Sequence, residues 1–423
     1  MLWGLGVGYV ISGMYFGWNL GLKEGGTLGM AIATFFVIVL YVAFTFSYTE
    51  LACAIPKAGG VFDYANRALG KNWGFVAGMA QNIEFIFAPP AIAFAIGAYF
   101  NLIFPHIPIV WTAIAAYILF TALNVFGVKA AALFELLITI LAVAELLIFA
   151  GVTLPHFQLN MLMLNAFPHG WSGVFAAIPF AIWFFLGIEG LANVAEETPN
   201  PQQDMLKGFG SSMLTLGVLC VLVFVAAIGV GGWQAIVFDA NGQPSDSPLP
   251  LAMAQVVGGQ SVLFHLLLTV GLFGLVASFH GLMLAGGRAT YEFAKFGYAP
   301  TSIGMLNDKF QTPANALMAN ALIGVLILLT GKTAEIITIA VFGALSLYII
   351  AMICVLVLRK NEPDMIRPFK VPFYPFSPII ALIIACVSLL SMTYFNSQLA
   401  LIYLGILLSS YLGFKVFISN IES

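Results

Sequence analysis

The sequence predicts an all-α membrane protein with twelve transmembrane helices, and composition, segment length and charge distribution each support this prediction. The 423 residues are 61% hydrophobic and only 8% charged, with a mean hydropathy of +1.02. A soluble domain cannot bury so large an apolar fraction. A helix that crosses a bilayer needs about 20 mainly apolar residues, whereas the strands of a membrane barrel alternate over shorter segments. Long apolar segments therefore favour helices.

Twelve apolar stretches of the required length follow one another along the chain. If the N-terminus is cytoplasmic, every lysine and arginine except Lys23 and Lys332 falls on the cytoplasmic side, as the positive-inside rule expects. One missed helix would reverse this sorting, so the charges support the count and place both termini in the cytoplasm. The stretches are residues 2–21, 27–55, 73–104, 108–126, 130–154, 172–193, 208–232, 262–290, 314–331, 334–359, 376–394 and 398–418.

The first stretch contains GLGVGYVISGMYFGWNLG, with glycine at positions 4, 6, 8, 13 and 17. Glycine at this density allows close packing between helices. It also marks a break in the helix, because each glycine lowers helix stability by about 1 kcal/mol. We favour a break, since residues 172–193 carry the same weakness. The residues at this predicted break are Ile11, Ser12, Gly13 and Met14.

The sixth stretch ends in WFFLGIEGLANVAEETPNP, from Trp183 to Pro201. Gly187 and Gly190 weaken the helix, and the Glu189 carboxylate between them is costly in lipid unless it faces protein or water. A broken helix would expose carbonyl groups at the end of its first half and N–H groups at the start of its second half. The alternative is a continuous helix with a buried, hydrogen-bonded Glu189.

The third stretch carries a carboxylate deep in the bilayer, in the segment MAQNIEFIFAPPAIAF. Glu84 lies two residues after the amide of Asn82, and Pro89 and Pro90 follow within two turns. The prolines lack the N–H groups that would pair with carbonyl groups one turn earlier. This collection of polar groups predicts a cation-binding site. The alternative is that Glu84 is protonated, or paired with another helix, and only holds the bundle together.

Three further titratable residues lie within apolar stretches: Glu135, Glu145 and His280. Glu135 and Glu145 are ten residues apart, so they need not share a helix face. Each is either a proton site or a protonated side chain without a function. His280 is either a titrating group near neutral pH or a histidine that is simply hydrogen-bonded. With Glu189, these residues are the candidates for coupling or gating.

The breaks suggest an internal repeat. Stretches one to five (residues 1–154) and six to ten (residues 172–359) each begin with a glycine-interrupted helix. Because five is odd, the two halves have opposite orientations in the membrane. This is the pattern of a secondary transporter with an inverted repeat and a site near the midplane. Residues 376–418 fall outside the repeat.

Other functional classes fit less well. An ion channel needs polar rings along a pore, whereas these polar residues cluster at one depth. No HExxH or GxSxG motif indicates an enzyme. The four cysteines stand singly, without the spacing of metal ligands, so we expect neither a metal nor a cofactor. A net charge of -3 gives no indication of a nucleic-acid partner. A signalling role stays open, although no soluble effector domain is present.

Four segments together resemble the amino acid, polyamine and organocation transporters, and the resemblance covers nearly the whole chain. They are SGMYFG, ELACAIPKAGGVFDYANRALG, FFLGIEGLANVAEETPNP and RATYEFAKFGYAP. The resemblance implies the leucine-transporter fold with a 5+5 inverted repeat, alternating access, and a place in the bacterial inner membrane. Within that superfamily, YVISGMYFGWNLGL, IEFIFAPPAIAFAIGAY and FELLITILAVAELLIFAG look most like bacterial ethanolamine permeases.

The resemblance also implies roles for individual residues. Residues 11–14 match the unwound part of helix 1, and Trp183 matches an aromatic gate beside the substrate. Phe184 to Leu186 match the segment whose carbonyl groups receive the substrate ammonium. Gly281 falls where some relatives carry a bulky aromatic. Proton-linked relatives often keep a lysine in helix 5, but Ala142 stands at that position here, so lysine-based coupling is in doubt.

The departures from amino acid carriers favour an amine substrate. An amino acid would place its carboxylate on helix 1 and its ammonium on helix 6, and needs no further charge. An amino alcohol lacks the carboxylate and gains from a fixed anion, because opposite charges about 4 Å apart attract by about 4 kcal/mol at a dielectric constant of 20. We therefore predict import of ethanolamine, with the ammonium between Glu84 and the carbonyl groups near Trp183–Leu186. The alternative is an amino acid permease or exchanger of the same fold.

The sequence leaves the coupling ion open between proton and sodium. It equally leaves open whether the protein works by symport or by exchange, which amines it accepts, and its oligomeric state in the lipid bilayer.

Overall fold

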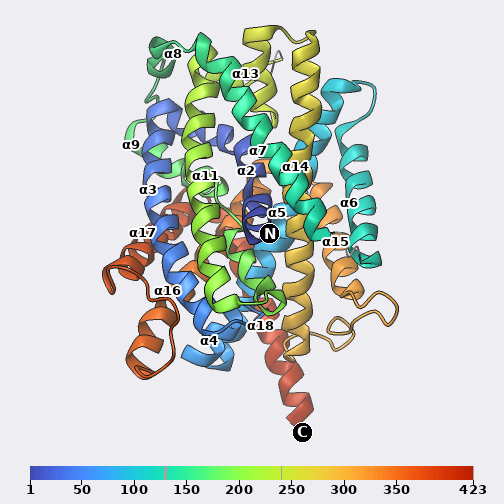
Figure 1. The fold of residues 1–423 in the computed structure, drawn as a ribbon, viewed down its shortest axis with the longest axis vertical. Coiled ribbons are helices and arrows are strands. Elements are labelled where there is room, and N and C mark those ends of the chain that lie inside the picture. Colours follow the sequence, from blue (N-terminus) through green and yellow to red (C-terminus); the bar gives the residue numbers. More distant parts are fainter. Residues whose placement is uncertain (128–130, 240, 423) are drawn as a thin grey trace.

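The protein, seen in a computed structural model, is a bundle of long helices (Figure 1). The structure describes residues 1–127, 131–239 and 241–422, and these contain no strand beyond one isolated bridge between Phe238 and Pro244. Ten helical segments of the described residues are long and apolar enough to cross a membrane. They are α3 (Trp18–Ala54), α5 (Lys71–Ile103), α6 (Ile109–Phe126), α7 (Ala131–Thr153), α10 (Ile178–Trp183) together with the 3₁₀-helix η2 (Ile188–Glu197), α11 (Pro201–Gly231), α14 (Val262–Lys295), α16 (Thr333–Asn361), α17 (Phe376–Phe395) and α18 (Ser397–Glu422).

Two of the twelve predicted stretches do not form such a helix. Residues 2–21 are divided between α1 (Leu2–Val10), α2 (Ser12–Tyr15) and the start of α3. Residues 314–331 form α15 (Ala314–Leu328), which has 15 residues. At 1.5 Å per residue α15 is about 22 Å long, shorter than a hydrocarbon core of about 30 Å. The structure thus has ten clear candidate spans, and the count of twelve stays a prediction.

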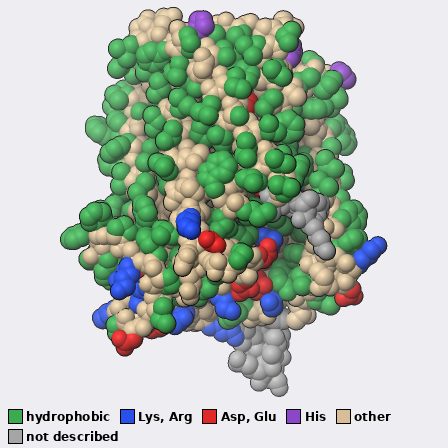
Figure 2. Space-filling model, viewed as in Figure 1, with side chains coloured by type: hydrophobic (Ala, Val, Ile, Leu, Met, Phe, Trp, Pro, Cys, Tyr) green, Lys and Arg blue, Asp and Glu red, His purple; other side chains and the backbone are tan. Residues whose placement is uncertain are grey.

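Charged side chains gather at one end of the bundle, whereas hydrophobic side chains cover most of its height (Figure 2). This distribution suits an integral membrane protein, whose lipid-facing surface must be apolar. Shorter elements connect the long helices. They are α4 (Val61–Leu69), η1 (Leu154–His156), α8 (Leu159–Met163), α9 (Gly170–Ala176), α12 (Gln234–Val237) and α13 (Pro248–Val257).

Helix α5 is the centre of the bundle. It packs against α16, α14, α4, α6 and α15, and it continues through Pro89 and Pro90 without ending. Its polar residues Gln81, Asn82 and Glu84 are all buried. Because these three side chains are buried among the helices that pack against α5, they lie inside the protein rather than in lipid.

Helix α3 joins two predicted stretches into one element of 37 residues. It bends once, at Gly26, where the backbone angles are φ 64° and ψ -171°. Positive φ favours glycine, and a Cβ at this position would lie 2.6 Å from the carbonyl oxygen of Ala166. Gly26 is therefore required both for the bend and for the close contact.

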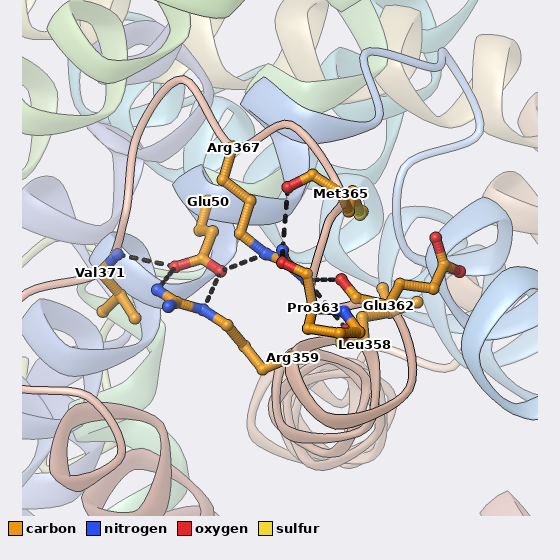
Figure 3. A network of polar contacts seen from close by, with 8 residues as sticks. All are labelled: Glu50, Leu358, Arg359, Glu362, Pro363, Met365, Arg367 and Val371. Atoms are coloured by element: carbon orange, nitrogen blue, oxygen red, sulfur yellow. Dashed lines mark hydrogen bonds and ion pairs between the residues drawn. The ribbon is translucent and has the colours of Figure 1, made fainter.

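A buried ionic network ties one end of α3 to the end of α16 (Figure 3). The Glu50 carboxylate, 2% exposed, accepts hydrogen bonds from Nε and Nη2 of Arg359, each at 2.7 Å. It also accepts one from the Val371 N–H at 2.7 Å, and Nε of Arg367 lies 3.2 Å from it. The network thus fixes the segment after α16 against α3.

Candidate functional site

The first predicted stretch, residues 2–21, which we call helix 1, is interrupted twice. α1 ends at Val10 and α2 begins at Ser12, although Ile11 between them keeps helical angles (φ -59°, ψ -23°). The larger departure comes one turn later, where Phe16 is extended (φ -161°, ψ 177°) and Gly17 has φ 88°. The predicted break at residues 11–14 is therefore correct in place to within a turn, but its non-helical backbone lies at Phe16 and Gly17.

The sixth predicted stretch, residues 172–193, which we call helix 6, is interrupted between α10 and η2. α10 ends at Trp183, and Gly187 has the left-handed angles φ 97° and ψ -3°. Residues 188–197 then continue as a 3₁₀-helix rather than an α-helix. The alternative of a continuous α-helix through Glu189 is thus wrong.

The interrupted parts of helices 1 and 6 lie against each other. A Cβ at Gly13 would be 2.5 Å from the Trp183 carbonyl oxygen and 2.9 Å from the Phe184 Cα. The rings of Phe16 and Trp183 meet edge to face, with centroids 5.4 Å apart, and those of Trp18 and Phe184 stack at 5.5 Å. The structure therefore brings the predicted residues of helices 1 and 6 together in the core.

Helix α14 holds the first interruption through Ser278. The Ser278 hydroxyl accepts a hydrogen bond from the Ser12 N–H at 2.8 Å and donates one to the Gly8 carbonyl oxygen at 2.7 Å. It thereby satisfies backbone groups that a broken helix leaves unpaired. Ser278 is fully buried. Its role depends on a contact across 266 residues of sequence, which no local pattern reveals.

A carboxyl pair lies where helix 6 resumes. Glu84 of α5 and Glu189 of η2 are both fully buried, and their carboxyl groups are close enough to interact electrostatically. The Tyr348 hydroxyl donates to Oε2 of Glu189 at 3.0 Å. Tyr348 in turn meets the Tyr41 hydroxyl at 2.9 Å, and Tyr41 donates to the Ile182 carbonyl oxygen at 3.3 Å. A chain of polar groups thus runs from α5 to the end of α10.

The Glu84–Glu189 pair has no cation beside it. In the part of the chain that the structure describes, no lysine, arginine or histidine forms an ion pair with either carboxylate. Among the described residues, neither oxygen of Glu84 has a hydrogen-bond partner. Two buried carboxyl groups that interact in this way cannot both be ionised without a counter-charge, so either at least one of them is protonated or the pair holds a cation.

Asn82 does not join this pair. Its Nδ2 donates to the Gly78 carbonyl oxygen at 2.8 Å, and its Oδ1 accepts from the Thr290 hydroxyl at 2.6 Å. Asn82 and Glu84 are two residues apart on a helix and so point in different directions. The structure therefore engages Asn82 with α14 rather than with Glu84.

A cavity of about 680 Å³ has both apolar and charged residues in its lining. Helices α1, α7, α11, α14 and η2 surround it, and we call it the α7–α14 cavity. Glu135 and His280 lie among its lining residues, with 2.9 Å between Oε2 of Glu135 and Nδ1 of His280. The lining residues are Met1, Leu2, Trp3, Leu5, Tyr9, Glu135, Val194, Glu197, Thr198, Pro199, Asp204, Lys207, Gly208, Ser211, His280, Gly281, Leu284 and Arg288.

Tyr9 is a residue of this site that sequence reasoning missed. A Cβ at Gly281 would lie 2.4 Å from Tyr9 Cδ1, and a Cβ at Gly190 would lie 3.2 Å from Tyr9 Cδ2. The Tyr9 ring therefore occupies the space that two glycines leave free. A bulky side chain at position 281, as in some relatives, does not fit while Tyr9 is there. The sequence pattern alone gives little indication of this role, because Tyr9 is one aromatic residue in a glycine-rich segment.

Glu145 lies apart from Glu135, although both are on α7 and buried. Glu145 contacts the Tyr15 hydroxyl, and a Cβ at Gly271 would be 3.8 Å from its Cδ. Glu135 instead contacts α1, because a Cβ at Gly8 would be 2.4 Å from its Oε1. The two carboxyl groups therefore face helix 1 on opposite sides of its first interruption.

Comparison with known proteins gives a consistent result. The amino acid permease family model matches residues 3–411. A branched-chain amino acid permease of Bacillus subtilis is 26% identical, covering 90% of this chain and 84% of its own length. A methylthioribose transporter of the same organism is 26% identical, with 89% and 84% covered. A vacuolar cationic amino acid transporter of Arabidopsis thaliana is 25% identical, with 85% and 62% covered.

Proposed function

The chain belongs to the amino acid permease family, and from this premise we propose that it imports a small cationic amine, ethanolamine above all, by alternating access. Its relatives are transporters, so a transport function rests on the family itself. Their names span branched-chain amino acids, cationic amino acids and methylthioribose. The family therefore leaves the substrate open, and the residues of the site must supply the argument.

The proposed architecture is the leucine-transporter fold, with inverted repeats at residues 1–154 and 172–359 and with residues 376–418 outside them. Two observations support it. The first helix of each half is interrupted, and the interruptions meet at Gly13 and Trp183. In transporters of this kind, broken helices form the substrate site near the midplane. We place both termini in the cytoplasm and the protein in the bacterial inner membrane.

The Glu84–Glu189 pair carries the proposal for an amine. It is a buried acidic site without a basic partner among the described residues, and an ammonium group can supply its counter-charge. A zwitterionic amino acid would add a carboxylate near two carboxyl groups, which is unfavourable. A substrate with an ammonium and a neutral hydroxyl fits this charge pattern better.

Neighbouring groups complete the proposed site. The ammonium lies between Glu84 and the carbonyl groups from Trp183 to Leu186, and Ser12 with other helix 1 backbone groups meets the hydroxyl. Trp183 caps the ammonium by a cation–π contact. Trp183 suits this role because it is 2% exposed and its indole N–H has no partner within the described residues. Phe184 and Leu186 contribute backbone carbonyl groups.

The second candidate is an amino acid permease or exchanger of the same fold. Curated relatives with amino acid substrates favour it. In this case the substrate carboxylate binds helix 1 N–H groups and its ammonium binds helix 6 carbonyl groups, while the Glu84–Glu189 pair only holds α5 against η2. The two candidates therefore differ in what they require of Glu84.

Ethanolamine binding to the purified protein tests the proposal. Choline, putrescine, alanine, leucine and arginine serve as competitors, and Glu84→Gln is compared with Glu145→Gln, which neutralises another buried carboxyl. We expect Glu84→Gln to weaken ethanolamine binding at least about 30-fold, because losing about 2 kcal/mol of charge attraction corresponds to that factor. If leucine or alanine binds instead and Glu84→Gln leaves that binding unchanged, Glu84 is structural and the second candidate is correct.

A further inference from the structure

A second pair of buried titratable side chains, Glu135 and His280, lies outside the proposed amine site and lines the α7–α14 cavity. The Glu135 and His280 side chains are only 2% and 4% exposed, yet both line a cavity that reaches charged surface residues such as Lys207 and Glu197. The pair is thus enclosed by protein but has a route to water. Neither residue contacts the Glu84–Glu189 pair in the described hydrogen-bond network.

The pair touches the part of helix 1 that precedes the interruption. A Cβ at Gly8 would lie 2.4 Å from Oε1 of Glu135 and 2.8 Å from Oγ1 of Thr139, so the α1 backbone lies directly on this carboxylate. Oε1 of Glu135 has no hydrogen-bond donor among the described residues. A charge change at Glu135 therefore changes the free energy of keeping α1 in place.

Helix α14 connects the pair to the interruption itself. Ser278, two residues before His280, holds both the Gly8 carbonyl oxygen and the Ser12 N–H. Gly281, the residue after His280, lies against the Tyr9 ring. Any shift of α1 away from Glu135 must therefore also disturb the contacts that Ser278 makes with helix 1.

Few charges face the pair from the surrounding elements. Tyr9 faces it from α1, and Arg288 of α14 lines the same cavity, 2.8 Å from Oε1 of Glu197 of η2. Asp204 and Lys207 of α11 line it further out. On the side away from the cavity, the His280 ring contacts the rings of Phe120 and Phe134. Glu135 is thus the one carboxylate in hydrogen-bond contact with His280 among the described residues.

We propose that Glu135 and His280 form a proton-binding site that couples one proton to each transported substrate. When the pair takes a proton, a carboxylate and a neutral imidazole become a carboxylate and an imidazolium, so the net charge rises from -1 to 0. The neutral pair favours the docked α1. Transfer of the proton from His280 to water in the α7–α14 cavity returns the pair to -1 and favours release of α1, which opens the site to the cavity.

This inference rests on the proposed function only in that the protein must transport a substrate. The test therefore uses two substrates, ethanolamine and leucine. The protein is reconstituted in lipid vesicles that contain a pH-sensitive dye, with the membrane potential clamped by potassium and valinomycin. Ethanolamine or leucine is added outside. Protein-free vesicles correct for passive entry of the free amine, which alkalinises the interior. Wild-type protein should acidify the interior relative to them, and an acidic exterior should drive accumulation.

Glu135→Gln and His280→Gln should both abolish this acidification and reduce accumulation driven by the pH gradient at least tenfold. They should keep substrate binding within about threefold and should keep exchange of labelled for unlabelled substrate, because a purely structural pair would impair binding and exchange as well. Glu145→Gln is the matched variant on the same helix and should keep the acidification.

Either of two results overturns the inference: acidification of wild-type size by Glu135→Gln, or its loss in Glu145→Gln alone. A wild-type protein driven by a sodium gradient without acidification also overturns it. If only leucine is transported, the proposed amine substrate is wrong, and the same variants assayed with leucine decide the proton site.

Discussion

Gly13 of α2 lies so close to Trp183 of α10 that a Cβ on Gly13 would be 2.5 Å from the Trp183 carbonyl oxygen. This contact is between two pieces of backbone, and not between side chains that can move aside. It explains why a glycine stands at position 13 of helix 1. It also leaves the end of α10 in direct contact with helix 1, as the proposed substrate site requires.

Gly13→Ala should therefore destabilise the protein by about 1–3 kcal/mol, the usual cost of forcing an extra methyl group into a packed core, and should reduce substrate uptake. The measurement is the thermal unfolding midpoint in detergent together with uptake by intact cells. Gly217→Ala is the control, because Gly217 is helical in α11 and a Cβ there meets no atom within 4 Å. Equal behaviour of the two variants would show that the contact with Trp183 is not tight.

Arg359→Gln should destabilise the protein by about 2–3 kcal/mol. It removes two hydrogen bonds of 2.7 Å from the buried Glu50 carboxylate, and breaking a buried ion pair leaves an uncompensated charge. Arg367 and the Val371 N–H still contact Glu50, which keeps the loss below that of an isolated pair. Thermal unfolding in detergent measures the effect.

Arg67→Gln provides the matched comparison. Arg67 also forms a two-pronged contact, with Glu362, but the two side chains are 45% and 33% exposed. An exposed pair contributes only about 0–1 kcal/mol. If Arg67→Gln proves as destabilising as Arg359→Gln, the burial of Glu50 does not explain how much the Glu50 network stabilises the protein.

Asp246→Asn should stabilise the protein at pH 8 by on the order of 1 kcal/mol and have no effect near pH 4. Burial raises the pKa of Asp246, which lies before α13, from 3.8 to about 6. The folded state therefore binds more protons than the unfolded state between these values, and stability falls as pH rises through this window. The asparagine variant lacks that fall and can still accept the hydrogen bond from Thr333.

Unfolding midpoints of Asp246→Asn and wild type, compared from pH 4 to pH 8, test this sign. The exposed Asp364 gives the control variant Asp364→Asn. A stability difference that is largest at pH 4 would contradict the assignment to Asp246.

Local sequence signals predicted the helices and their interruptions well, because glycine density and apolar length act within one segment. The same reasoning placed the break of helix 1 at residues 11–14, whereas the backbone departs most at Phe16 and Gly17. Gly17 was visible as a glycine, but its positive φ and its close contact with the Trp183 ring depend on packing between distant segments.

Contacts between distant segments could not be predicted in this way. Glu84 and Glu189 each stood out as a buried carboxylate, but nothing in either segment indicates that they meet. The same holds for Glu135 and His280, which lie 145 residues apart.

The bend at Gly26 has a consequence for motion. α3 has no loop between residues 18–25, which continue helix 1, and residues 27–54, which form helix 2. If residues 18–25 tilt during a transport cycle, they either carry helix 2 with them or rotate about the backbone of one glycine. A hinge of this kind is limited to very few residues. The backbone at Gly26 thus determines whether residues 18–25 and residues 27–54 move as one rigid unit or independently.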